Sequence, residues 1–175
     1  TLTIGRTDGD MTYVKYKEQV FKVSSDIISF ANDSSYNIVS KLQALVDISE
    51  VKSVTVEYNG AEHTIDITHN DSDMTFVLDG QKVDTKITQA IYKSIVGLAV
   101  DGVYKDETLG DTVMKIKYKG IKSSSDTEIE FKSIDDLYCA LIRNGKTEFT
   151  IKKSKLNEFM DLFNTYVENP EKQGD

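Results

Sequence analysis

Two stretches of the chain carry the same order of structural signals. Residues 74–100, MTFVLDGQKVDTKITQAIYKSIVGLAV, and residues 137–163, LYCALIRNGKTEFTIKKSKLNEFMDLF, each contain an alternating segment, a tight-turn pair, a second short segment and a helical pattern. Alternation of apolar and polar residues is typical of half-buried strands, whereas apolar residues three or four apart are typical of helices on a core. The chain is therefore predicted to form hairpins that are each followed by a helix.

Turn chemistry indicates where the strands reverse. The pairs Asn-Gly at 59–60, Asp-Gly at 79–80 and Asn-Gly at 144–145 each separate two strand patterns. Such pairs tolerate positive φ at both central positions of a type I′ turn, whose twist suits a two-residue hairpin. The sequence therefore predicts three antiparallel hairpins that are closed by two-residue turns.

Helical patterns follow these hairpins. Asp84 and Ser154 are predicted to be the N-caps, because short polar side chains accept hydrogen bonds from the free N–H groups of a first turn. The predicted buried stripes are Ile87, Ile91, Ile95 and Leu98, with Ala90, in the first helix, and Leu156, Phe159, Met160, Phe163 and Val167 in the second.

The first third of the chain resembles a shorter version of the same pattern. Strand patterns at TLTI, TYVKY and VFKV precede a helix that is predicted to start in the run 24–26, Ser-Ser-Asp. A second helix is predicted at 36–46, YNIVSKLQALV, with Ile38, Leu42 and Leu45 as its apolar stripe.

We expect an α+β fold of repeated hairpin–hairpin–helix units, with mainly antiparallel sheet and the helices packed on one face. Residues 1–50 are predicted to be an N-terminal partial repeat, 51–104 the first full repeat, 105–168 the second full repeat, and 169–175 a disordered tail. We favour a true duplication because element order, turn chemistry and capping agree. The plainer alternative is that hairpins followed by helices occur in any α+β protein.

Composition limits the classes of partner. The chain carries a formal net charge of −8, and no nucleic-acid partner is expected because phosphate binding requires a basic surface. No apolar run reaches the roughly 18–20 residues of a membrane span. The chain begins at Thr1 rather than Met, so we expect a trimmed or processed product, which leaves room for a removed signal or anchor.

Few residues are equipped for catalysis or metal binding. His63 and His69 share a strand face, but their Cα atoms are expected about 20 Å apart, too far to hold one metal, and both are predicted to be surface residues at strand ends. Cys139, the only cysteine, lies in the apolar segment LYCALI and is predicted to be buried filler rather than a nucleophile. We expect no catalytic residue, no metal ligand, no cofactor and no enzymatic activity, and the sequence identifies no binding residue.

Acidic residues gather in two segments. Asp71 and Asp73 have the spacing found in calcium loops, but the other EF-hand positions are missing, so a polar loop is the preferred interpretation. Asp106, Glu107 and Asp111 are predicted to lie in a solvated linker, with a loosely bound cation as the alternative.

A lysine stripe marks one predicted strand. Lys115, Lys117 and Lys119 alternate with Met114, Ile116 and Tyr118, which are predicted to face inward, and Lys122 extends the stripe. The lysines either bind an acidic partner, or they keep the sheet face hydrated and prevent a strand edge from aggregating. We prefer the second interpretation.

Three stretches resemble a bacterial family that carries a domain-of-unknown-function label. They are TLTIGRTDGDMTYVKYKEQVFKVSSDII at 1–28, EVKSVTVEYNGAEHTI at 50–65, and MTFVLDGQKVDTKITQAIYKSIVGLAVDGVY at 74–104. Members of the family are membrane-anchored extracytoplasmic proteins that are encoded beside ABC-2 type transporters and gliding-motility auxiliary components, and their corresponding pieces also repeat. One departure is Phe76, where many relatives are expected to have tryptophan.

The resemblance implies a cellular location and an association with a transporter, but it identifies no functional residues. It implies a non-enzymatic extracytoplasmic accessory or binding module of an ABC-type transport system, with a transporter permease or another membrane or envelope protein as partner. The full-length protein is expected at the cell surface, in contact with the membrane only through an anchor absent from this chain. The alternative hypothesis is a cell-surface scaffold that binds protein or glycan. A third hypothesis is an envelope-acting enzyme that uses carboxylates.

Overall fold

The structure, a computed structural model, describes residues 1–33, 35–70 and 73–169. It contains two compact units, Thr1–Val39 (unit 1) and Ser40–Asp175 (unit 2). Both contain antiparallel sheet, and helices accompany the strands, so the predicted α+β class with mainly antiparallel sheet is confirmed. The predicted disordered tail falls outside the described residues, except for Asn169.

Unit 1 is built on a three-stranded antiparallel sheet. Its strands β1 (Leu2–Asp8), β2 (Met11–Tyr16) and β3 (Gln19–Ser24) are neighbours in chain order, which matches the three predicted strand patterns. The 3-10 helix η1 (Ser25–Asn32) follows β3 directly, where a helix start was predicted. A single helical turn, α1 (Ser35–Ile38), comes next.

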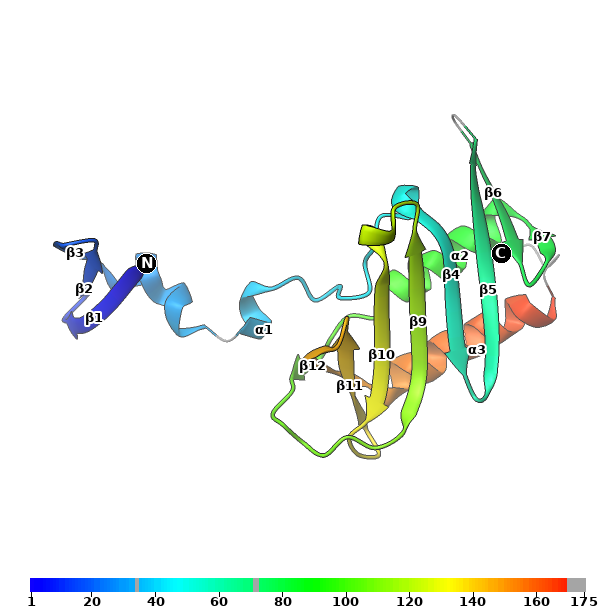
Figure 1. The fold of residues 1–175 in the computed structure, drawn as a ribbon. Helices are drawn as coiled ribbons and strands as arrows, with labels where there is room; N and C mark the ends of the chain where they lie inside the picture. Colours follow the sequence, from blue (N-terminus) through cyan, green and yellow to red (C-terminus); the bar gives the residue numbers. More distant parts are fainter. Residues whose placement is uncertain (34, 71–72, 170–175) are drawn as a thin grey trace. The chain divides into compact units, whose positions relative to one another are not determined.

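Unit 2 contains a nine-stranded sheet with the order β7-β6-β5-β4-β9-β10-β11-β12-β8 (Figure 1). Every strand pair in it is antiparallel, and the central pair is β4 with β9. The strands are β4 (Val51–Tyr58), β5 (Ala61–Asn70), β6 (Asp73–Leu78), β7 (Gln81–Val83), β8 (Gly102–Val103), β9 (Thr112–Gly120), β10 (Thr127–Ser133), β11 (Tyr138–Arg143) and β12 (Lys146–Lys152). The 3-10 turns η2 (Ile48–Glu50) and η3 (Ser123–Ser125) precede β4 and β10.

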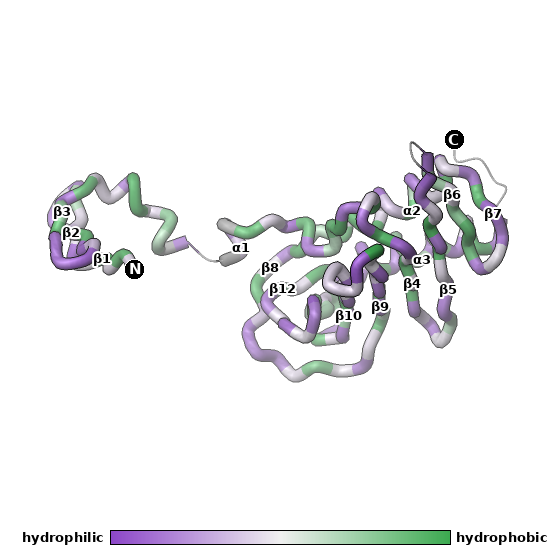
Figure 2. Tube along the Cα trace, turned by 45° about the horizontal axis from the view of Figure 1, so that its top comes forward, coloured by the Kyte–Doolittle hydropathy of each residue, from purple (hydrophilic) through white to green (hydrophobic). Residues whose placement is uncertain are grey.

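Two helices cover one face of this sheet. Figure 1 shows α2 (Thr85–Val96) and α3 (Lys153–Glu168) on the same side of the strands, and the two helices contact each other. Apolar and polar residues alternate along the strands in Figure 2, as a sheet with one covered face requires. The core between sheet and helices includes Val56, Ile65, Phe76, Ile116, Phe131, Leu141, Ile87, Ile91, Ile95, Leu156, Phe159 and Phe163.

The predicted turns and inward-facing residues are present. All three turn pairs have positive φ at both positions, for example 51° at Asn59 and 78° at Gly60. Met114, Ile116 and Tyr118 of β9 are buried, as predicted. The local signals in the sequence were therefore sufficient to place these hairpins.

One of the two predicted helix caps is present. Asp84 is the N-cap of α2, and its Oδ1 accepts a hydrogen bond from the backbone N–H of Lys86 at 2.7 Å. The prediction for Ser154 was wrong, because α3 begins at Lys153, directly after β12. The backbone N–H of Lys153 donates to the carbonyl oxygen of Leu137 at 2.8 Å, so a neighbouring loop satisfies this helix start.

The helix predicted at 36–46 is largely absent. Only its first turn belongs to α1, and Leu42 and Leu45 are exposed instead of forming a buried stripe. The side chain of Ile38 lies outside the described part of the chain. Residues 40–47, called the strap below, form no continuous helix.

Long-range hydrogen bonds explain why the strap is not helical. Its carbonyl oxygens are bound by groups from the sheet and from the segment after α2, rather than by N–H groups four residues later. Lys41 O accepts from Val100 N at 3.0 Å, Gln43 O from Arg143 Nη1 at 2.6 Å, and Ala44 O from Tyr118 Oη at 3.0 Å. Tertiary contacts therefore override a helical pattern that is weak by itself.

No helix among the described residues is both long enough and apolar enough to cross a bilayer.

Candidate interaction surfaces

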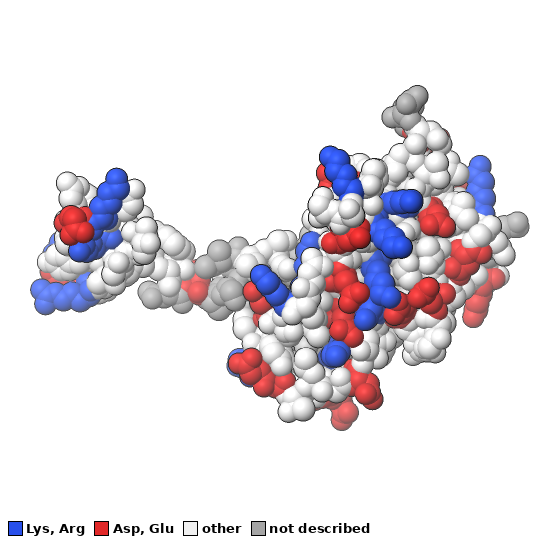
Figure 3. Space-filling model, viewed as in Figure 1, with Lys and Arg blue, Asp and Glu red and all other residues white. Residues whose placement is uncertain are grey.

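The face of the unit 2 sheet opposite the helices is polar. It is called the open face and is defined by alternate residues of four central strands: Thr55, Glu57, Glu62, Thr64, Lys115, Lys117, Glu128 and Glu130. These residues point away from α2 and α3 because their strand neighbours fill the core. Figure 3 shows basic side chains running along the middle of this face with acidic side chains on both sides.

Strand register places lysines and carboxylates beside one another on the open face. Lys115 of β9 lies opposite Glu57 of β4 and Glu130 of β10, while Lys117 lies opposite Thr55 and Glu128. Directly opposite residues on antiparallel strands are close enough for their side chains to interact, and diagonal neighbours are within reach of long side chains. The open face is therefore a cross-strand charge ladder.

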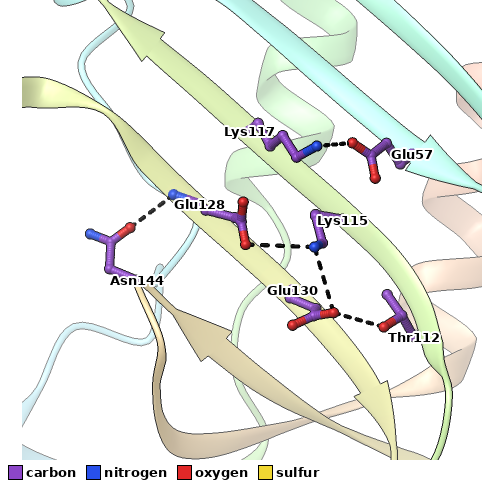
Figure 4. Close-up of polar contacts among 7 residues, drawn as sticks. All are labelled: Glu57, Thr112, Lys115, Lys117, Glu128, Glu130 and Asn144. Atoms are coloured by element: carbon purple, nitrogen blue, oxygen red, sulfur yellow. Dashed lines mark hydrogen bonds and ion pairs between the residues drawn. The ribbon is translucent and has the colours of Figure 1, made fainter. Parts of the chain in front are cut away.

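The ion pairs of this ladder are partly diagonal (Figure 4). Lys117 Nζ donates a hydrogen bond to Glu57 Oε1, and Lys115 Nζ lies 3.6 Å from Glu128 Oε1 and 3.7 Å from Glu130 Oε1. Thr112 Oγ1 also donates to Glu130 Oε1 at 2.7 Å. Each of the two lysines is thus held between strands by carboxylates from other segments of the chain.

The charges in the ladder shift one another's protonation. The hydrogen bond from Lys117 lowers the pKa of Glu57, and the same contact raises the pKa of Lys117. Because both side chains are partly exposed, water screens the pair and its contribution to stability is modest.

The lysine stripe is only partly available for an acidic partner. Lys115 and Lys117 already have carboxylate partners within the chain. Lys119 and Lys122 are exposed and form no ion pair within the described ranges. Sequence analysis did not single out Glu128 and Glu130, and it is the register of β9 with β10 that places them beside the lysines.

The two histidines lie near the two ends of β5, as predicted, but both are half-buried rather than fully exposed. His63 Nδ1 lies 2.7 Å from Asp79 Oδ2, and its ring contacts Tyr58 and Phe163 with centroids 5.9 and 5.8 Å away. His69 Nε2 donates to Val51 O at 2.7 Å, since a carbonyl oxygen only accepts. Each histidine therefore connects strands to neighbouring segments.

Cys139 is fully buried in β11, as predicted for a packing residue. Burial is the largest of the effects that raise the pKa of its thiol, while Lys153 acts in the opposite direction. A raised pKa lowers the fraction of reactive thiolate.

In both acidic segments a carboxylate accepts a hydrogen bond from a nearby backbone N–H group. Asp73 Oδ1 accepts from Met74 N at 2.8 Å, and Glu107 Oε2 accepts from Lys105 N at 2.7 Å. Asp71 lies outside the described residues. Within residues 1–33, 35–70 and 73–169, no three His, Cys, Asp or Glu side chains are arranged to hold a metal ion.

Unit 1 exposes large apolar side chains. Leu2, Ile4, Tyr16 and Phe21 belong to its three strands and are between 41% and 49% exposed. Of the apolar residues on these strands, Val14 is buried. Exposed apolar groups on one small sheet mark an interaction surface more often than isolated exposed residues do.

No protein-family model, curated protein or solved structure matches the chain significantly.

Proposed function

We propose that this chain is a non-enzymatic extracytoplasmic accessory or binding module of an ABC-type transport system. The location and the transporter neighbourhood come from the family resemblance of residues 1–28, 50–65 and 74–104. The structural observation that supports a binding role is the open face, a broad sheet surface without helices whose charged side chains are held in place by one another.

The charge ladder favours a partner with cationic groups. Four glutamates on the open face, Glu57, Glu62, Glu128 and Glu130, surround the two lysines 115 and 117. An acidic partner would have to displace these internal carboxylates, whereas a cationic partner meets carboxylates that are already oriented. Preorganised side chains lose less conformational freedom on binding, which favours affinity.

We propose further that unit 2 arose by duplication of a hairpin–hairpin–helix unit. The order β7-β6-β5-β4 followed by β9-β10-β11-β12 supports this, because each set of four strands runs outward from the central pair. A helix follows the last strand of each set. The consequence for function is one continuous open face that is twice as wide as a single unit could form.

A cell-surface scaffold that binds protein or glycan is the second candidate. The observation that favours it is the mixture of hydroxyl and carboxylate groups on the open face, where Thr55 Oγ1 and Thr64 Oγ1 lie 3.0 Å apart beside Glu57 and Glu62. Such groups also suit sugar hydroxyls. An envelope-acting enzyme is less well supported, since the carboxylates of Glu128 and Glu130 converge on Lys115 rather than on an open cleft.

Site-specific photocrosslinking of the full-length, membrane-tethered protein in its own cells tests the proposal. The crosslinker replaces Glu62 on the open face, and a matched control replaces Glu158, an exposed residue of α3. Mass spectrometry of the crosslinked products should recover a permease or ATPase from position 62 but not from 158. Recovery of only glycan or unrelated surface proteins would support the scaffold hypothesis instead. Equal recovery from both positions would show that the open face is not the binding surface.

A further inference from the structure

Three two-residue turns of unit 2 share one backbone conformation. Their first residues are Asn59, Asp79 and Asn144, with φ between 47° and 51°, and the glycine that follows each has φ between 78° and 82°. Differences in the chemistry of these turns therefore depend on how the three side chains are held.

Two of these side chains are tied to a neighbouring strand. Asp79 N donates to Thr64 O at 2.9 Å, and Asp79 Oδ1 accepts from Thr64 N at 2.8 Å. Asn144 N donates to Glu128 O at 2.9 Å, and Asn144 Oδ1 accepts from Glu128 N at 2.8 Å (Figure 4). In both turns the side-chain oxygen is therefore fixed by a backbone N–H group of another strand.

Asn59 is not tied in this way. In the other two turns the tie is made to the residue that precedes the register partner of the strand's last residue. The register of β4 with β9 pairs Tyr58 with Met114, so the backbone in the corresponding place is that of Val113. Among the described residues, neither the backbone N–H nor the side chain of Asn59 forms a hydrogen bond.

A β-bulge in β9 explains the missing tie. The register of β9 with β10 passes from Met114 directly to Thr112, so Val113 has no partner on β10. An extra residue of this kind bends its strand and interrupts the regular ladder. The start of β9 and the β4–β5 turn line a cavity of about 330 Å³, and both Asn59 and Val113 belong to its lining.

The backbone of Gly60 is equally unhindered. Its N–H donates no hydrogen bond among the described residues, and a Cβ at this position would meet no atom within 4 Å apart from its chain neighbours. Glycine allows close approach to the backbone because it has no side chain. The Gly60 nitrogen can therefore reach Cγ of Asn59 once that side chain rotates, and no hydrogen bond opposes the rotation.

We propose that Asn59 is a site of deamidation in the folded chain, in preference to Asn144. The deprotonated backbone nitrogen of Gly60 attacks Cγ of Asn59, the new C–N bond closes a succinimide ring, and the side-chain nitrogen takes up a proton and leaves as ammonia. Water then adds to one of the two ring carbonyl carbons, and the C–N bond to that carbon breaks. The products are aspartate at position 59 or its isoaspartate isomer.

Deamidation changes both the charge and the length of this turn. It adds one negative charge to a chain whose formal net charge is −8. The new carboxylate belongs to a cavity lining that also includes Glu57 and Glu62 of the open face. Isoaspartate carries its β-carbon in the main chain and so lengthens a turn that sets the register of β4 with β5. The modification therefore alters one end of the open face.

Peptide mapping of the 175-residue chain after incubation at mildly alkaline pH tests the proposal. Incubation in heavy-oxygen water labels each new carboxylate, so mass spectrometry measures the rates at positions 59 and 144 separately. In the folded chain the rate at Asn59 should exceed that at Asn144 by about five-fold or more, because ring closure at Asn144 first breaks a hydrogen bond. In urea, where both turns are unfolded, the two rates should agree within about two-fold.

Charge variants provide a second readout. Anion-exchange chromatography of the incubated wild-type chain should show a growing, more acidic form. Asn59→Gln should remove most of that form, because glutamine would have to close a larger ring that forms more slowly, whereas Asn144→Gln should leave it. Native rates that are equal or both undetectable, a faster rate at Asn144, or the same preference in urea would overturn the proposal. Neither measurement involves a partner, so failure here would leave the proposed function unaffected.

Discussion

Lys117 Nζ donates a hydrogen bond to Glu57 Oε1, although the residue directly opposite Lys117 on β4 is Thr55. The bond therefore crosses the β4–β9 pair diagonally and connects strands β4–β7 to strands β9–β12. It depends on the register of β4 with β9, since a shift of one residue would turn every side chain to the other face.

Replacing Glu57 by Gln should lower the free energy of unfolding by about 0.2–1 kcal/mol at neutral pH, the range of partly exposed ion pairs. The Lys117 hydrogen bond lowers the pKa of Glu57 in the folded state. The contribution is therefore present above the unfolded pKa and is lost as the pH falls through the folded pKa. Urea unfolding at neutral pH and again near pH 3 measures the loss in the free energy of unfolding at each pH.

The difference between wild type and Glu57→Gln should thus shrink in acid, and it should also shrink in high salt. Glu158→Gln on α3 is the control, and its effect should change little between the two pH values. An effect of Glu57→Gln that persisted unchanged in acid would show that lost packing, rather than lost charge, explains it.

Replacing Tyr118 by Phe should destabilise unit 2 by about 1–2 kcal/mol, because Ala44 O then loses a buried hydrogen-bond donor. Hydrogen exchange at Val100 N, which donates to Lys41 O, should become faster because the strap is held by fewer bonds. Tyr138→Phe is the control, since Tyr138 is half-buried in β11 and distant in sequence from the strap. Unchanged exchange at Val100 would contradict a role for Tyr118 in holding the strap.

Burial also raises the pKa of Tyr118 above its ordinary value. A group whose pKa is raised on folding adds stability below the unfolded pKa of about 10 and loses it as the pH rises toward the folded value. Wild-type unit 2 should therefore lose stability above about pH 10, and Tyr118→Phe should lose less over the same range. Thermal unfolding across that alkaline range measures the difference.

Hairpins and inward faces were predictable because their causes are local. Asn59-Gly60 sets its turn by backbone preference, and the alternation around Ile116 selects the buried face. The charge ladder could be predicted only in part. The lysine stripe is visible in the sequence, but the positions of Glu57 and Glu128 beside it depend on which strands pair and in which register.

The failures have tertiary causes. The strap has helical spacing, yet Arg143 and Tyr118, far along the chain, take its carbonyl groups. Ser154 resembles a cap, yet Leu137 O binds the first N–H of α3. His63 has the strand parity of the buried Ile65, which places it on the covered face, where the ring of Phe163 from α3 contacts it. No pattern within a single segment indicates such contacts.

The two predicted helix caps allow a matched test. Asp84→Ala removes the acceptor for Lys86 N and should destabilise unit 2 by about 0.5–2 kcal/mol. Ser154→Ala should change stability by less than about 0.5 kcal/mol, because α3 begins at Lys153 without a side-chain cap. Urea unfolding of both variants measures the loss in the free energy of unfolding. Equal losses in Asp84→Ala and Ser154→Ala would indicate that Ser154 also stabilises its helix.

The thiol of Cys139 should react only when unit 2 opens. It is fully buried, and burial raises its pKa, so both access and thiolate fraction are low in the folded chain. Labelling with a thiol reagent at neutral pH should be much slower than in urea, and its rate should rise in variants that destabilise unit 2, such as Asp84→Ala. Phe21→Glu in unit 1 is the control and should leave the rate unchanged. Fast labelling of the native chain would show that β11 opens locally without unfolding of the core.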